Sequence, residues 1–436
     1  MPTGDKQDIM TLIFIYFFLF SYGLEKVVGL QYNLVRGFSL MNLSLYLLIF
    51  VWALRAINEK KLFQPNNVNR YLLLMILIMA FSVINKVFLH EIPHISITKD
   101  IIYFKGHIDP FILFFVMFNI INDVSTCKRV LFALLLLFSI TLLTAVLQKY
   151  GIAQFSNVHV HGMDEMERIS GFANANEYAS YLVLFIPLVL SNLLFRKELL
   201  TKITGGALFI IALMGLLVTG SRGGILSLVF SISIYLMILK REKVMTFGRT
   251  VLVTYFLVIL IGSSVVFAPS GVRQMMIERF TRLATAGNSY ENRNLNKATG
   301  SRLELWAGGL QLFLERPILG HGQDTIQLLM AKRFGLYAKA HNQYINYMIE
   351  FGIIGCIVYI IILLKVFKHM WKHMEETTDS WSKFLYLSYI AGFSGWTFSM
   401  LGVQLYQTTY LFWVYTAVIY RYSQLAEVKK DSFSPV

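Results

Sequence analysis

Long apolar stretches recur along the whole chain, and they constrain its fold more than any other feature. Each holds roughly 17 to 25 residues, enough for one helix to cross a bilayer core about 30 Å thick. Of the 436 residues, 56% are hydrophobic and only 15% are charged. A soluble domain of this length does not have that balance. The sequence therefore predicts an all-α polytopic membrane protein, with residues 1–436 forming a single integral membrane domain.

About twelve transmembrane helices are predicted. The first begins near Met10 and has no A-x-A-like cleavage site after it, so we interpret it as a retained helix and not as a signal peptide. The predicted spans are 10–24, 38–57, 71–89, 104–122, 130–148, 178–195, 203–219, 223–239, 249–268, 343–364, 384–402 and 406–421.

Basic residues follow every even-numbered span. By the positive-inside rule, this pattern places both termini in the cytoplasm. The clusters are Lys60, Lys61 and Arg70; Lys128 and Arg129; Arg196, Lys197 and Lys202; Lys240, Arg241 and Lys243; Lys365, Lys368 and Lys372; and Arg421, Lys429 and Lys430.

Residues 269–342 form a long loop on the outer side, where the same rule gives no reason to collect cations. Its cations are Arg273, Arg279, Arg282, Arg293, Lys297, Arg302, Arg316, Lys332, Arg333 and Lys339. We expect an anionic ligand there. The net charge of +14 thus comes from basic residues at the ends of the spans and in this loop. Because the membrane surface accounts for the first group, nucleic acid is not an expected partner. The segment "RLELWAGGLQLFLERP" predicts an amphipathic helix that ends before Pro317. We expect one or two such helices in the loop, lying over the membrane mouth.

The stretch "VTGSRGGILS", residues 218–227, is predicted to be an outer hairpin. Ser221 is a suitable N-cap, and Arg222 then lies beside a helix N-terminus, where free N–H groups and the dipole favour an anion. An Arg at that point can bind a phosphate with two parallel hydrogen bonds. The alternative is a glycine-rich turn with a snorkelling Arg.

Two further arginines are candidate ligands. Arg168, in "ERISGFANANEYASYL", lies near Asn174 and Asn176, whose amides can bind a polar substrate; the alternative is that the asparagines cap the next helix. Arg302 begins the amphipathic loop helix, where it is either a ligand or a solvated charge. In "PILGHGQDT", His321 and Gln323 belong either to a substrate-contacting loop or to a simple turn.

The stretch "AHNQYINYMIEFGIIG" begins polar and turns apolar. His341 lies at the outer end of the tenth span, where an imidazole can take a proton from a hydroxyl near neutral pH. Taken alone, this stretch favours the alternative in which His341 and Asn342 cap a helix at the water interface. Glu350, inside the span, is a functional candidate; the alternatives are a structural ion pair and a protonated, hydrogen-bonded acid.

Signals for metal and disulfide chemistry are missing from the sequence. It has no D-x-D pair, P-loop, H-E-x-x-H or G-x-S-x-G, and Asp164, Glu165 and Glu167 read as solvated loop residues. Cys127 and Cys356 are far apart and have no partner spacing. We therefore predict no metal, no cofactor and no disulfide.

With these residues located, the chain resembles the O-antigen ligase and polymerase superfamily of bacterial membrane glycosyltransferases. "HN", nine residues and then "GIIG" fits the ligase signature, and "TGSRGG" and "RPILGHG" look like further family stretches. The resemblance covers most of the chain and is most specific from Arg168 to Gly355. It implies a GT-C-like fold in the bacterial inner membrane, with the active site facing the periplasm or outside.

The resemblance also implies a reaction. A glycan linked through diphosphate to undecaprenyl would be the donor, and a glycan or glycolipid acceptor such as the lipid A core would attack its anomeric carbon. Arg168, Arg222 and Arg302 would contact the diphosphate, replacing a metal ion. His341 would be the base or the group that orients the acceptor, supported by Asn342, and the apolar bundle would hold the polyprenyl tail beside membrane lipid.

Other functions remain open at this point. A polysaccharide polymerase differs from a ligase only in the acceptor, which would be another lipid-linked chain, and protein-targeted oligosaccharide transfer is a third variant. A twelve-helix transporter or flippase would place function at mid-membrane, often between repeated halves. Neither a half-repeat nor many mid-membrane charges are present. A membrane-bound O-acyltransferase would also use a membrane histidine.

Overall fold

A computed structural model describes residues 3–30, 33–35, 38–60, 63–88, 97–153, 168–195, 198–243 and 302–431. It is helical except for a short antiparallel pair of strands, β1 (Asn33–Val35) and β2 (Phe38–Ser39). The helices are α1 (Thr3–Tyr22), the π-helical η1 (Gly23–Val27), α2 (Leu40–Asn58), α3 (Asn69–Phe88), α4 (Ile97–Ile120), α5 (Val124–Lys149), α7 (Ala175–Phe195), α8 (Leu199–Val218), α9 (Arg222–Arg241), α13 (Arg302–Glu315), α14 (Ile326–Phe334), α15 (Gln343–Glu376), α16 (Ser380–Ser399) and α17 (Thr409–Asp431).

The all-α membrane fold is confirmed. Nine of the described helices are long and apolar enough to cross a bilayer. Eleven of the predicted spans coincide with a described helix, α16 and α17 included. The ninth, 249–268, lies outside the described residues, as do the acidic cluster at 164–167 and the loop cations from Arg273 to Lys297. The number twelve therefore stays a prediction.

The helix boundaries differ from the apolar runs at several places. α1 begins at Thr3 and α4 at Ile97, each seven residues before its predicted span, and α15 continues to Glu376, where 364 was predicted. The added residues at the end of α15 include Lys365, Lys368 and Lys372. Lys is a good helix former, so the helix runs on past the apolar core of a membrane. Hydropathy marks the apolar part of a helix and not its end.

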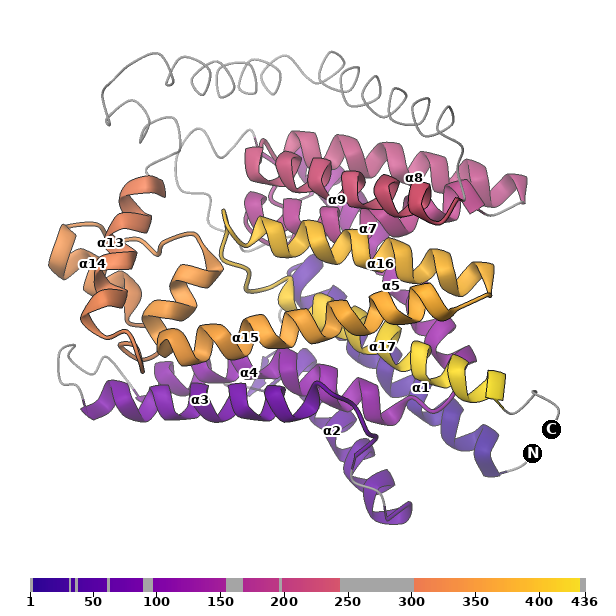
Figure 1. The fold of residues 1–436 in the computed structure, drawn as a ribbon, viewed down its shortest axis with the longest axis horizontal. Coiled ribbons are helices and arrows are strands. Elements are labelled where there is room, and N and C mark those ends of the chain that lie inside the picture. Colours follow the sequence, from indigo (N-terminus) through magenta and orange to yellow (C-terminus); the bar gives the residue numbers. More distant parts are fainter. Residues whose placement is uncertain are drawn as a thin grey trace.

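The long helices lie side by side in a bundle, and Figure 1 shows α13 and α14 at one end of it. The labelled termini lie at the opposite end. α7 is the most buried span, with 78% of its apolar window inside the structure. It packs against α8, α9 and α16.

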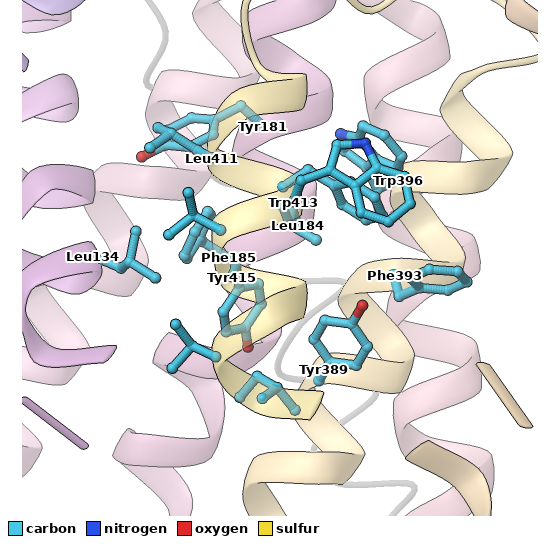
Figure 2. Packing of buried hydrophobic residues seen from close by; sticks show 14 of the residues in the cluster. Leu134, Tyr181, Leu184, Phe185, Tyr389, Phe393, Trp396, Leu411, Trp413 and Tyr415 are labelled. Carbon is cyan, nitrogen blue, oxygen red and sulfur yellow. The ribbon is translucent and has the colours of Figure 1, made fainter. Parts of the chain in front are cut away.

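Aromatic side chains fill the centre of the bundle. Figure 2 shows rings from α7, α16 and α17 meeting there. Phe185 of α7 stacks on Tyr415 at 5.0 Å, and Trp396 of α16 stacks on Phe412 at 3.6 Å between ring centroids. Such pairs contribute about 0.5–1.5 kcal/mol each beyond their buried area. This packed core joins the three helices along the middle of the bundle.

A second, smaller core lies at the end of the bundle that carries α13 and α14. Its buried residues come from α13, α14 and the first turns of α15: Leu305, Leu312, Ile326, Leu329, Met330, Ala340, Ile345 and Ile349. We call residues 302–351 the cap. The predicted amphipathic helix over "RLELWAGGLQLFLERP" is confirmed as α13, which ends at Glu315, just before Pro317.

Candidate active site

Arg222 is the first residue of α9, as the hairpin motif predicts. Ser221 is the N-cap, and its hydroxyl oxygen accepts a hydrogen bond from the Gly224 N–H at 3.2 Å. The preceding turn places Gly220 at a φ of 61°, in the left-handed region that glycine adopts easily. The hairpin thus presents Arg222 at a capped helix N-terminus, where the macrodipole favours an anion.

The guanidinium group of Arg302, on the first residue of α13, lies against two glycine backbones. A Cβ atom added at Gly402 would lie 3.2 Å from Arg302 Nη1, and one added at Gly223 would lie 4.0 Å from it. Gly223 adjoins Arg222, and Gly402 follows α16. The contact at Gly402 is tighter than an ordinary one, so the absence of a side chain there helps the guanidinium group to lie beside the start of α9.

The positive charges of Arg222 and Arg302 repel one another. Burial, and then the positive charge of Arg222, lower the pKa of Arg302 from its usual value. Within the described ranges Arg302 has no ion pair to an acidic side chain. Two like charges held together in a partly desolvated place favour an anionic ligand, which would relieve their repulsion.

His341 belongs to the same end of the structure. Its backbone has a φ of 49°, an uncommon conformation that His adopts more readily than bulky apolar residues. The side chain is exposed, and in the described part of the chain its ring makes no hydrogen bond. Crowding by the surrounding protein, then the charges of Arg302 and Lys339, lower the pKa of the imidazole. A neutral imidazole at physiological pH is available as a base.

The backbone on both sides of His341 is tightly held. Asn342 is buried and caps α15, since its Oδ1 accepts hydrogen bonds from the N–H groups of Tyr344 at 3.0 Å and Ile345 at 3.1 Å. The Gln343 N–H donates to the Met400 carbonyl at 2.9 Å. The Ala340 N–H donates to Asn346 Oδ1 at 3.3 Å. A free ring on a fixed backbone is the arrangement that a positioned catalytic group requires.

Arg168 lies beside the same hairpin, but two of its donors are engaged there. Its Nε donates to the Thr219 carbonyl at 2.7 Å and its Nη2 to Asn176 Oδ1 at 3.0 Å. These bonds join the segment before α7 to the turn that presents Arg222. Asn174 accepts hydrogen bonds from the N–H groups of Asn176 and Glu177, which matches the capping alternative.

His321 and Gln323 lie inside the protein. His321 is 3% exposed, and its Nε2 is 2.8 Å from the Leu312 carbonyl oxygen. Gln323 is fully buried and donates from Nε2 to the Asp100 carbonyl at 3.0 Å. These contacts favour the structural turn over a substrate-contacting loop. The structure therefore brings Arg222, Arg302 and His341 to one end, with Arg168 adjoining, and places these two residues in packing roles.

Sequence reasoning did not anticipate the break in α15. Gly352 has φ 68° and ψ −172°, so the helix turns sharply there. The loop 317–322 supplies replacement hydrogen bonds. The N–H groups of His321 and Gly322 donate to the carbonyls of Ile349 at 2.8 Å and Glu350 at 3.0 Å. The Ile353 N–H donates to the Pro317 carbonyl at 2.8 Å. Backbone hydrogen bonds therefore join the "RPILGHG" stretch to the helix at the start of the "GIIG" stretch.

An apolar groove runs down the bundle from this site. It has a volume of about 590 Å³ and lies between α9, α15 and α16. Tyr344 and Leu401 line one end, next to Asn342 and Gly402, and Leu364 and Phe367 line it further along α15. The lining is apolar apart from the polar groups of Tyr344, Ser394 and Thr397. Such a groove suits a molecule with a charged head and a long hydrocarbon tail.

Residues 207–360 match the model of a protein family described as O-antigen ligase. That range includes Arg222, Arg302 and His341, whereas Arg168 lies outside it. An O-antigen ligase of Pseudomonas aeruginosa is 33% identical over 75 residues, 17% of this chain and 19% of that protein. An uncharacterized protein of Haemophilus influenzae is 26% identical over 195 residues, 42% of this chain and 47% of that protein.

The chain thus spans less than half the length of these curated relatives. The resemblance predicted from the "HN…GIIG", "TGSRGG" and "RPILGHG" stretches is nevertheless confirmed at the level of the superfamily.

Proposed function

We propose that this chain, which belongs to the O-antigen ligase superfamily, transfers a glycan from a polyprenyl diphosphate to an acceptor hydroxyl on the outer face of the membrane. The family supports a ligase- or polymerase-type membrane glycosyltransferase. The observation that carries the finer proposal is the meeting of two cations and a free imidazole. Arg222, Arg302 and His341 come from three distant segments to one end of the bundle.

The proposed reaction needs no metal ion. The acceptor oxygen forms a bond to the anomeric carbon while the bond from that carbon to the diphosphate oxygen breaks. His341 takes the hydroxyl proton, and the polyprenyl diphosphate leaves with the bonding electron pair. Arg222 and Arg302 stabilise its negative charge, as preorganised donors do best where charge develops. The Ser221-capped N-terminus of α9 adds its dipole.

The groove between α9, α15 and α16 is proposed to hold the polyprenyl tail. One end lies next to Gly402, which contacts Arg302, and its α9 wall includes Phe230, which follows the exposed Val229. A lipid-linked donor would then place its diphosphate at the outer membrane surface. We also propose that both termini are cytoplasmic. The two chain ends lie together, at the end away from the cap (Figure 1).

The acceptor separates the two closest functions. A ligase would use a lipid A core sugar, and a polymerase would use the growing end of a second lipid-linked chain. The His-Asn signature favours the ligase. Purified protein given an undecaprenyl-diphosphate glycan and each acceptor in turn would decide between them. Formation of a lengthened lipid-linked glycan, with no product on lipid A core, would replace the ligase proposal by the polymerase.

Variants test the assigned site in the same assay. Arg302→Ala is expected to lower the transfer rate by roughly 10²–10³-fold, the usual effect of losing one oxyanion-stabilising donor. Arg333→Ala is the matched control, because Arg333 is an exposed cap arginine whose ion pair is with Glu315. His341→Ala should abolish transfer while lipid donor binding persists. Equal activity of Arg302→Ala and Arg333→Ala would refute the proposed diphosphate site.

A further inference from the structure

Lys339, two residues before His341, is held from several sides. Its Nζ donates to the Tyr103 hydroxyl oxygen at 2.8 Å and lies 3.7 Å from Asp324 Oδ1. The ammonium also lies 4.7 Å from the centre of the Tyr103 ring. Only 16% of the Lys339 side chain is exposed. A long, flexible cation is therefore fixed in one place, which a solvated surface lysine is not.

Glu350 forms hydrogen bonds with both residues that contact Lys339, Tyr103 and Asp324. Its Oε1 accepts hydrogen bonds from the Tyr103 hydroxyl at 3.2 Å and from the Asp324 N–H at 3.1 Å. Glu350 is 1% exposed. The hydrogen bonds therefore run in order, from the ammonium of Lys339 to Tyr103 and from Tyr103 to Glu350. The four residues come from α4, the loop before α14, the segment before α15, and α15 itself.

The network converges on the backbone that carries His341. Asp324 has a φ of 55°, and the loop before it is joined to α15 through the break at Gly352. Lys339 continues into Ala340, which is fully buried and bonded to Asn346. A shift of Lys339 would therefore move His341. The charge of Lys339 also acts on the imidazole directly.

We propose that Lys339, held by Tyr103, Asp324 and Glu350, is a positioning residue for His341. It fixes the segment that presents the ring, and it keeps a cation beside the ring so that the imidazole rests in its neutral form. The assignment of His341 as the base rests on the proposed function; the placement of Lys339 does not. The network also gives Glu350, an acid inside a membrane-spanning helix, a defined role.

The charged groups around His341 act in one direction. Arg302 on α13 and Lys339 on the adjoining segment both lower the pKa of the imidazole, in addition to the crowding by the surrounding protein. Arg222 on α9 faces Arg302. Asp324, which pairs with Lys339, is also acted on by Lys86, and the Glu350 carboxylate is bonded to Tyr103 and to the Asp324 N–H. Removing the Lys339 charge takes away one of the two cations that act on the ring, and that loss favours the protonated form.

The first experiment measures the ring and not the reaction. Diethyl pyrocarbonate modifies neutral imidazole, so the pH dependence of His341 modification, followed by peptide mass spectrometry on the purified protein, reports its protonation. Lys339→Gln should move the midpoint to higher pH, and Lys339→Arg should restore the wild-type midpoint. Lys332→Gln, an exposed lysine on α14, is the control. An identical midpoint in Lys339→Gln and Lys332→Gln would overturn the proposal.

A second variant separates position from charge. Tyr103→Phe keeps every charge but removes the oxygen that accepts from Lys339. It should lower kcat for glycan transfer by roughly ten- to a hundredfold, as small misplacements of a catalytic group do, with KM for the lipid donor unchanged. Unchanged kcat in Tyr103→Phe would refute the positioning role. A shifted His341 midpoint in Lys339→Gln, with a pH–rate profile for transfer that does not shift with it, would support the placement and exclude His341 as the base.

Discussion

The junction between the loop 317–322 and α15 gives the sharpest prediction about stability. Gly352 has a φ and ψ that essentially only glycine adopts. Any other residue in this conformation carries backbone strain of about 1–3 kcal/mol. A Cβ atom there would lie 2.0 Å from the Ile318 carbonyl oxygen, so one of the two backbones would have to move by about 1.5 Å to reach an ordinary contact distance. That movement would stretch the hydrogen bonds made by Ile353, His321 and Gly322.

Each of those three hydrogen bonds contributes about 1 kcal/mol. With the backbone strain, Gly352→Ala should destabilise the junction by about 4–6 kcal/mol. Gly335→Ala is the matched control, because Gly335 has the same φ of 68° but nothing within 4 Å of an added Cβ. It should lower stability by only about 1–2 kcal/mol, from the left-handed conformation alone.

Two measurements check this difference in detergent-purified protein. Thermal unfolding, followed by intrinsic fluorescence, should show a much larger fall in Tm for Gly352→Ala than for Gly335→Ala. Hydrogen exchange of a peptide covering residues 317–325 should lose protection only in Gly352→Ala. Equal Tm values and unchanged exchange in the two variants would show that the loop and helix are not joined as described.

Three further predictions concern stability, pH and metal. Glu177→Ala should lower Tm and cost about 2–4 kcal/mol, because the Glu177 carboxylate accepts from the N–H groups of Tyr406 and Thr408; an unchanged Tm would contradict this. Initial transfer rates should persist below pH 6.5 and fall only as the pH drops through the lowered pKa of His341. Arg302→Gln removes one of the charges that lower this pKa, so its rate should fall at a higher pH. A fall at the same pH in the wild type and in Arg302→Gln would contradict the assignment of His341 as the base. EDTA should leave the rate unchanged, and a loss reversed by Mg²⁺ would refute cation substitution by arginine.

Much of the fold could be predicted because membrane spans are selected by length and hydropathy alone. The apolar runs located eleven described helices, and the pattern around Leu305 and Leu312 located α13. The helix ends were less accurate. Hydropathy does not detect the basic turns after residue 364, which stay helical because water and lipid head groups accept their charges. The strands β1 and β2 are too short to leave a periodic signal.

The candidate site was predictable where backbone chemistry is local. The "SRGG" hairpin implies a capped helix with an Arg at its start, and the structure has that arrangement at Arg222. Long-range contacts were beyond reach. Nothing in the sequence indicates that Gly402 lies beside Arg302, or that Tyr103 binds Lys339 from more than two hundred residues away. The break at Gly352 also depends on the distant loop that replaces its lost hydrogen bonds.

The cap is one uninterrupted piece of chain with a core of its own. It carries Arg302 and His341, whereas Arg222 belongs to the bundle beneath. A chimera that exchanges residues 302–351 between two related proteins would therefore need only two splice points, and it would leave the aromatic centre of the bundle intact. Such a graft would carry the proposed proton acceptor and one of the proposed phosphate-binding arginines to a new host, while the host kept its own walls of the apolar groove on α9 and α16.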